Sequence, residues 1–84
     1  MMEPDAIREI LERALPDCTA VVTDDAGDKQ HFSAEVVSSA FEGLPRVRQH
    51  RLVYQALGGL ADGRIHALAL KTYTPARWNA RGRT

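Results

Sequence analysis

The side chains of this sequence that could bind a metal ion are few and lie far apart in the chain. Its 84 residues include one cysteine, Cys18, and three histidines, His31, His50 and His66. A single cysteine permits neither an internal disulfide nor a CxxC metal or redox site within one chain. Any iron, zinc or cluster chemistry would therefore have to be shared with a second molecule.

Two of the histidines lie at the starts of predicted strands. His31 begins a strand that ends at Ser38, and His66 lies near the start of a strand from Ile65 to Thr72. If these strands are parallel neighbours, their first residues lie at the same edge of the sheet and the two imidazoles could converge there. The acidic loop before His31 ends at that edge too, and it offers alternative oxygen ligands: Asp24, Asp25 and Asp28.

His50 and Cys18 are weaker candidates for ligands. His50 lies on the apolar stripe of a long helix, where a partly buried histidine with a polar partner is the expected state. Cys18 begins the first strand, about five residues from the acidic loop, or roughly 17 Å at 3.3 Å per residue. We expect it to be a half-buried structural thiol, remote from the two strand histidines.

The elements that would position these side chains follow from hydrophobic periodicity and from proline and glycine. The two strand-like runs on either side of the acidic loop are predicted to form an antiparallel hairpin. The last strand follows a helical crossover, so it is predicted to lie parallel to its neighbour in the sheet. The predicted fold class is α+β, with helices packed against a three-stranded mixed sheet in the order α-β-β-α-α-β-α. The predicted elements are a helix from Pro4 to Pro16, strands from Cys18 to Thr23 and from His31 to Ser38, a short helical turn within Ser39 to Leu44, a helix from Pro45 to about Leu60, a strand from Ile65 to Thr72 and a helix from Thr74 in which Trp78 packs back.

Size and composition describe an ordinary small globular protein. The chain is 44% hydrophobic and 26% charged, which predicts a single domain spanning residues 1–84, with 79–84 as a frayed tail. No run of about 18 apolar residues and no signal sequence is present, so we expect a cytoplasmic protein without membrane contact. The sequence has no nucleophile paired with a base and no Gly-rich phosphate loop, so we expect no enzymatic activity.

The zero net charge conceals a division between the two halves. Residues 1–42 hold ten acids and three bases, a net charge of −7, and residues 43–84 hold one acid and eight bases, a net charge of +7. This polarity can mark a basic binding face, or the two halves can interleave on folding and offset each other. The basic residues that could contact a partner or nucleic acid are Arg48, Arg51, Arg64 and Lys71.

Three blocks of the sequence resemble the BolA family. They are the segment from His31 to Gly43, the segment from Arg48 to Tyr54, and the segment from Ile65 to Pro75 together with Trp78. The blocks occur in order and cover nearly the whole chain, and the short acidic loop is similar to that of the IbaG-type members.

The resemblance implies a fold similar to a type II KH domain and two functions. The first is an adaptor that binds a monothiol glutaredoxin as a heterodimer and shares a [2Fe-2S] cluster with it and with glutathione, in iron-sulfur trafficking or iron and redox regulation. The family histidine at the start of the third strand corresponds to His66. The alternative is a DNA-binding transcriptional regulator of stress response and cell morphology, which would contact duplex DNA.

The sequence departs from the family pattern in the loop between the first two strands. The resemblance implies a second cluster ligand there, a histidine or cysteine, but this loop has neither within it. Its candidates are His31, where the second strand begins, or the carboxylates Asp24, Asp25 and Asp28. The KH-type GXXG tetrapeptide is also absent, which disfavours KH-style RNA binding and leaves DNA contacts by the basic half open.

Overall fold

The computed structural model describes residues 3–25, 27, 31–58 and 67–81. The described elements follow the predicted order and confirm the α+β fold class. They are α1 (Pro4–Ala14), β1 (Thr19–Asp24), β2 (His31–Val37), the 3₁₀ helix η1 (Ser39–Phe41), α2 (Arg46–Leu57), β3 (Ala67–Tyr73) and α4 (Pro75–Arg81). None of these described helices is long and apolar enough to cross a membrane.

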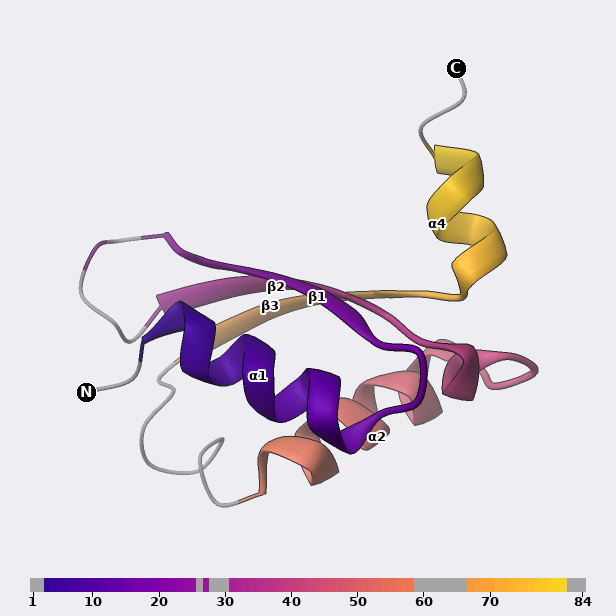
Figure 1. Ribbon diagram of the computed structural model, residues 1–84, viewed down its shortest axis with the longest axis horizontal. Helices are drawn as coiled ribbons and strands as arrows, with labels where there is room; N and C mark the ends of the chain where they lie inside the picture. Colours follow the sequence, from indigo (N-terminus) through magenta and orange to yellow (C-terminus); the bar gives the residue numbers. More distant parts are fainter. Residues whose placement is uncertain (1–2, 26, 28–30, 59–66, 82–84) are drawn as a thin grey trace.

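The three strands form one mixed sheet in the order β1-β2-β3 (Figure 1). β1 and β2 are antiparallel, with Thr19 opposite Val37, whereas β2 and β3 are parallel, with His31 opposite Ala67. Both pairings agree with the predictions from the hairpin loop and the helical crossover. β2 is therefore the central strand, and β1 and β3 each have one outer edge.

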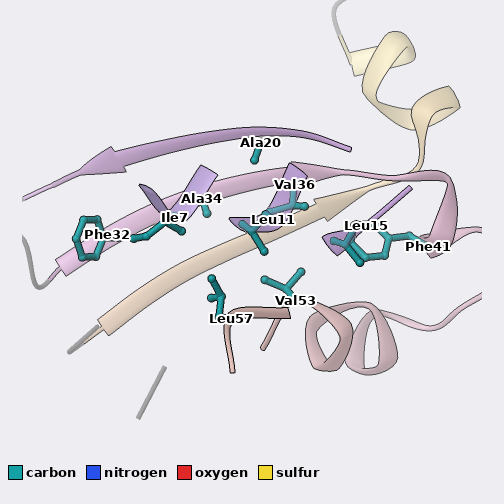
Figure 2. Packing of buried hydrophobic residues seen from close by; sticks show 10 residues of the cluster. All are labelled: Ile7, Leu11, Leu15, Ala20, Phe32, Ala34, Val36, Phe41, Val53 and Leu57. Carbon is teal, nitrogen blue, oxygen red and sulfur yellow. The ribbon is translucent and has the colours of Figure 1, made fainter. Parts of the chain in front are cut away.

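Helices α1 and α2 cover the same face of the sheet (Figure 1), and the core lies between them and the strands (Figure 2). In β2 the buried residues alternate with half-buried ones, as expected for a strand with one covered face. The apolar faces of α1 and α2 supply the side chains that pack against these buried residues. The core cluster consists of Ile7, Leu11, Leu15, Ala20, Phe32, Ala34, Val36, Phe41, Val53 and Leu57.

Ser38 is a fully buried polar residue at the point where β2 ends. Its hydroxyl donates to the carbonyl of Pro16 (2.6 Å) and accepts from the backbone N–H of Ala40 (3.1 Å). Its own N–H donates to the carbonyl of Tyr73 (3.1 Å). Because a buried hydroxyl is tolerated only when it is hydrogen-bonded, Ser38 fixes the α1–β1 turn, η1 and the end of β3 relative to one another.

The outer edge of β1 is tied to α1 by Glu12. One carboxylate oxygen of Glu12 accepts a hydrogen bond from the backbone N–H of Ala20 (3.2 Å), and the other accepts from the Arg8 guanidinium (2.8 Å). The Ala20 N–H points away from β2, since it reaches a helix side chain. The contact thus satisfies a backbone donor that an edge strand would otherwise present to solvent.

Two helix ends differ from the sequence prediction. α2 ends at Leu57 and not near Leu60, because Gly58 adopts a φ of +58° and its N–H donates to the Tyr54 carbonyl (3.0 Å). With a ψ of −136°, this positive φ turns the chain out of the helix, in a conformation that glycine adopts readily because it has no Cβ. α4 continues to Arg81, so residues 79–81 are helical rather than part of a frayed tail. The predicted start of the third strand, Ile65, and residues 82–84 lie outside the described residues.

Cys18 is half-buried and packs against the core cluster. Burial raises the pKa of its thiol from 9.0 to about 11, and the negative charge of Glu12 adds to the shift. Both causes disfavour the thiolate, which is the nucleophilic and metal-binding form of cysteine. Cys18 is therefore an unreactive structural thiol, in agreement with the prediction.

The substitution Leu57→Ala should lower the free energy of unfolding by about 2 to 5 kcal/mol, because it leaves a cavity beneath α2. Leu57 is 3% exposed, whereas Val47 on the same helix is 69% exposed. Val47→Ala is the matched control and should change stability by less than about 0.5 kcal/mol. Urea denaturation measures both, and a loss below about 1 kcal/mol for Leu57→Ala would contradict the packing described.

The thiol of Cys18 should react slowly with iodoacetamide at pH 8 in the folded protein, roughly a hundredfold more slowly than in urea. A pKa near 11 instead of 9.0 reduces the thiolate fraction by that factor. Glu12→Gln, which removes the nearby charge, should partly restore the rate. The same shift should make stability decline between about pH 9 and 11, since unfolding then releases a proton. Mass spectrometry measures the alkylation, and equal folded and unfolded rates would exclude the shift.

Candidate functional site

The first candidate region is the end of the sheet where β2 and β3 begin, which we call the His31 edge. His31 is the first residue of β2, is half-buried, and lies opposite Ala67 in the parallel register. Ala67 directly follows His66 in the sequence. His66, Asp28 and Arg64, which sequence analysis also selected, lie outside the described residues.

Two of the three candidate carboxylates are described, and they belong to the hairpin. Asp25 accepts hydrogen bonds from the hydroxyls of Thr23 (3.2 Å) and Ser33, and its backbone N–H donates to the His31 carbonyl (2.9 Å). These bonds close the β1–β2 hairpin beside His31, a role that the sequence alone did not indicate. Each Asp25 carboxylate oxygen thus already accepts one hydrogen bond, which leaves it one lone pair for any further contact. Asp24 is half-buried opposite Phe32.

The described residues do not gather a complete metal site. No group of three or more histidine, cysteine, aspartate or glutamate side chains among them is arranged to hold a metal ion. Cys18 adjoins Thr19, which pairs with Val37 at the opposite end of β2 from His31. Cys18 is thus remote from His31, as predicted.

A second candidate region is a groove of about 620 Å³ on the outer side of β3. Four consecutive β3 residues contribute to it, together with the start of α2 and one residue of α4. Three of its side chains are the cations Arg46, Lys71 and Arg77, and none of the lining residues is acidic. The lining residues are Leu44, Pro45, Arg46, Gln49, His50, Leu70, Lys71, Thr72, Tyr73 and Arg77.

Gln49 holds the groove together, although nothing in the sequence marked it. Its amide nitrogen donates to the carbonyls of Leu44 (2.8 Å) and Phe41 (3.3 Å), and its amide oxygen accepts from the Thr72 hydroxyl (2.6 Å). One side chain thereby joins α2 to β3 and to the segment after η1. His50, the next residue, is half-buried and lines the groove, so it is not part of the His31 edge.

An aromatic contact attaches α4 to the end of β3. The rings of Tyr73 and Trp78 meet edge to face with centroids 5.2 Å apart, and the Arg81 guanidinium lies 3.5 Å from the Trp78 centroid. The Thr74 hydroxyl accepts from the Arg77 N–H (3.3 Å), which confirms the predicted N-cap. These contacts set the position of Arg77 at the groove.

The basic residues selected from the sequence are divided between two surfaces. Arg48 and Arg51 are exposed on α2 and do not line the groove, whereas Lys71 is exposed on β3 and does. Arg46 and Arg77, which the sequence analysis did not select, complete the groove. Only the packing of α2 and α4 beside β3 brings these two residues near Lys71.

Comparisons with known proteins give one consistent result. The family described as "BolA-like protein" matches residues 12–77. The acid stress protein IbaG of Escherichia coli (strain K12) is 41% identical over 78 residues, which cover 92% of this chain and 89% of IbaG. BolA-like protein 1 of Mus musculus is 42% identical over 80 residues, or 87% of this chain, and the chain spans only 58% of the mouse protein's length.

Solved structures agree with these sequence matches. A bolA protein homologue from Coxiella burnetii has a TM-score of 0.81 and 39% identity, covering 94% of this chain and 99% of that one. The solution structure of the mouse BolA1 protein has a TM-score of 0.82 and 38% identity, covering 96% of this chain and 72% of that one. The residues matched by the family include all three strands and α2, and the chain therefore belongs to the BolA-like protein family.

Proposed function

We propose that this protein is a cytoplasmic BolA-like adaptor that binds a monothiol glutaredoxin and shares a [2Fe-2S] cluster with it. The cluster would be held by His66 and His31 from this chain, and by the glutaredoxin cysteine and glutathione from the partner. The observation that carries the proposal is the parallel register, in which His31 lies opposite Ala67, the residue after His66.

The donor set of this chain is compatible with half of such a site. A [2Fe-2S] cluster requires four protein or thiol ligands, and Rieske-type centres use two imidazoles in place of two thiolates. This chain has a single cysteine, and its thiol is held in the protonated form at the other end of the sheet. The thiolates would therefore come from the partner, and the imidazoles from this chain.

His31 is supported as the second ligand by the way the hairpin holds it. Its carbonyl accepts from the Asp25 N–H, which fixes the backbone at the start of β2. The Asp25 carboxylate is already engaged by Thr23 and Ser33, so it is a poorer candidate than the imidazole. Asp24 and Asp28 are the remaining alternatives for this position.

The family membership is consistent with a role in binding and not in catalysis. BolA-like proteins are not enzymes, as the sequence analysis predicted for this chain. An adaptor needs only a binding surface and ligands, and neither requires catalytic groups.

DNA binding is a second candidate function, favoured by one relative and by exposed arginines. The DNA-binding transcriptional regulator BolA of Haemophilus influenzae is 38% identical over 58 residues, which cover 69% of this chain and 56% of that protein. Arg48 and Arg51 project from α2 into solvent. They would contact phosphates of duplex DNA together with Lys71 and Arg64, as a regulator of stress response and cell morphology requires.

The cluster assignment predicts a colourless protein that forms a coloured complex only with a glutaredoxin and glutathione. In that complex His66→Ala should shift the visible circular dichroism spectrum towards that of the glutaredoxin homodimer, because an imidazole ligand is lost. His31→Ala should produce a partial change. His50→Ala is the control, since His50 lies on α2 away from the His31 edge. The complex formed by this variant should have the wild-type spectrum.

A His66→Ala complex with the wild-type spectrum would exclude His66 as a ligand, whatever its affinity. If His31→Ala alone left the visible circular dichroism spectrum unchanged, a carboxylate or another group would complete the site. Reconstitution of the same colour in this protein alone would contradict the shared site.

The DNA hypothesis predicts an affinity for duplex DNA that falls steeply as salt rises, because bound phosphates release counterions. Arg48→Ala and Arg51→Ala should each reduce the logarithmic salt slope by roughly one if the residue contacts a phosphate. Arg13→Ala, an exposed arginine on α1, should leave the slope unchanged. Fluorescence anisotropy from about 20 to 200 mM salt measures the slope. Absence of binding even at the lowest salt concentration would reject DNA binding as a function.

A further inference from the structure

We propose that the groove beside β3 binds an extended acidic segment of a partner protein, which pairs with β3 as a fourth strand. The site is separate from the His31 edge and does not depend on the proposed cluster. Three features support this site: the hydrogen-bonding groups of the β3 edge, the charges around it and the length of the groove.

The outer edge of β3 presents backbone donors and acceptors to the groove. The Tyr73 carbonyl faces β2, since it accepts from the Ser38 N–H (3.1 Å). Backbone groups alternate in direction along a strand, so those of Lys71 also face β2, whereas those of Leu70 and Thr72 face outward. β3 is the last strand of the described sheet, and no further described strand lies on that side.

The side chains around this edge are cationic and come from three elements. Arg46 belongs to α2, Lys71 to β3 and Arg77 to α4, and all three are exposed. Among the described residues, none of the three forms a salt bridge, and the lining contains no carboxylate. The groove therefore complements a segment that carries negative charge.

The dimensions and rigidity of the groove suit a short strand. Leu70 to Tyr73 line it in sequence, which corresponds to roughly 10 Å of extended chain at 3.3 Å per residue. Gln49 bonds both to Thr72 and to the carbonyls of Phe41 and Leu44, so the wall formed by α2 is fixed relative to β3 before any partner arrives. A preformed groove lowers the cost of ordering on binding.

A peptide satisfies this edge better than a phosphate chain does. Phosphate oxygens match the three cations but are acceptors only, so they leave the outward carbonyls of Leu70 and Thr72 without a donor. An extended peptide offers N–H and C=O groups at the period of the strand and can place carboxylates beside the cations. Strand addition thus uses both the charge and the backbone of the groove.

The site can be tested with the protein alone and a synthetic probe. The probe is a fluorescein-labelled peptide, Val-Glu-Val-Glu-Val-Glu with an amidated C-terminus, and binding is followed by anisotropy in low salt. The double charge reversal Lys71→Glu with Arg77→Glu should weaken binding at least tenfold. The matched control, Arg48→Glu with Arg51→Glu, makes the same change of charge on α2 outside the groove and should alter the affinity less than twofold. Circular dichroism verifies that both variants fold.

The backbone pairing requires its own measurement. Bound peptide should slow hydrogen exchange at the amides of Leu70 and Thr72, and a probe N-methylated at alternate residues should lose at least tenfold in affinity. Equal binding of the N-methylated probe would overturn strand addition, and equal weakening by both charge reversals would overturn the location. A six-nucleotide single strand that binds more tightly and displaces the peptide would assign the groove to nucleic acid and reject the proposal. No detectable peptide binding would reject it as well.

Discussion

The parallel hydrogen bonding between β2 and β3 is the constraint on which the rest of this structure depends. β3 follows β2 only after η1 and α2, so the crossover must return the chain to the edge where β2 began. That return lays α2 over the covered face and sets His31 opposite Ala67. The buried hydroxyl of Ser38 anchors the other end of the pair, where β2 ends and η1 begins.

One consequence of this pairing is that the two candidate regions lie at different positions along β3. The His31 edge is where β2 and β3 start, and the groove lies beside the second half of β3. Leu70, where the groove begins, is three residues from Ala67, or roughly 10 Å at 3.3 Å per residue. A single protein partner could therefore engage both regions.

Much of the fold could be predicted from local signals in the sequence. The apolar stripe of α1, with Ile7 and Leu11 at its centre, follows helical periodicity, and the acidic glycine-containing loop separates two strand-like runs. The end of α2 differs from the prediction because a glycine in the last turn can either continue a helix or leave it, and the positive φ of Gly58 ends this one. Ser38 resembled an isolated strand hydroxyl because its partner Pro16 lies 22 residues away.

The candidate sites differ in how far the sequence could reveal them. His31 was identifiable because its importance comes from its position at the start of a strand, which a sequence pattern can locate. The groove was not identifiable, because it arises where α2, β3 and α4 meet. Gln49, Arg46 and Arg77 carry no local signal of proximity, and only their packing makes them neighbours. The basic residues selected from charge alone therefore include Lys71 but not Arg46 and Arg77, which line the same groove.

The hydrogen bond from the Ala20 N–H to Glu12 has a consequence for assembly. A sheet with two open edges can add copies of itself in both directions and grow into a fibre. Here the Ala20 N–H, one of the outward donors of β1, is already occupied by a carboxylate from the same chain. A further strand that paired with β1 at this point would have to displace Glu12. Strand addition is therefore disfavoured beside Ala20, which favours growth of the sheet at β3 over growth at β1.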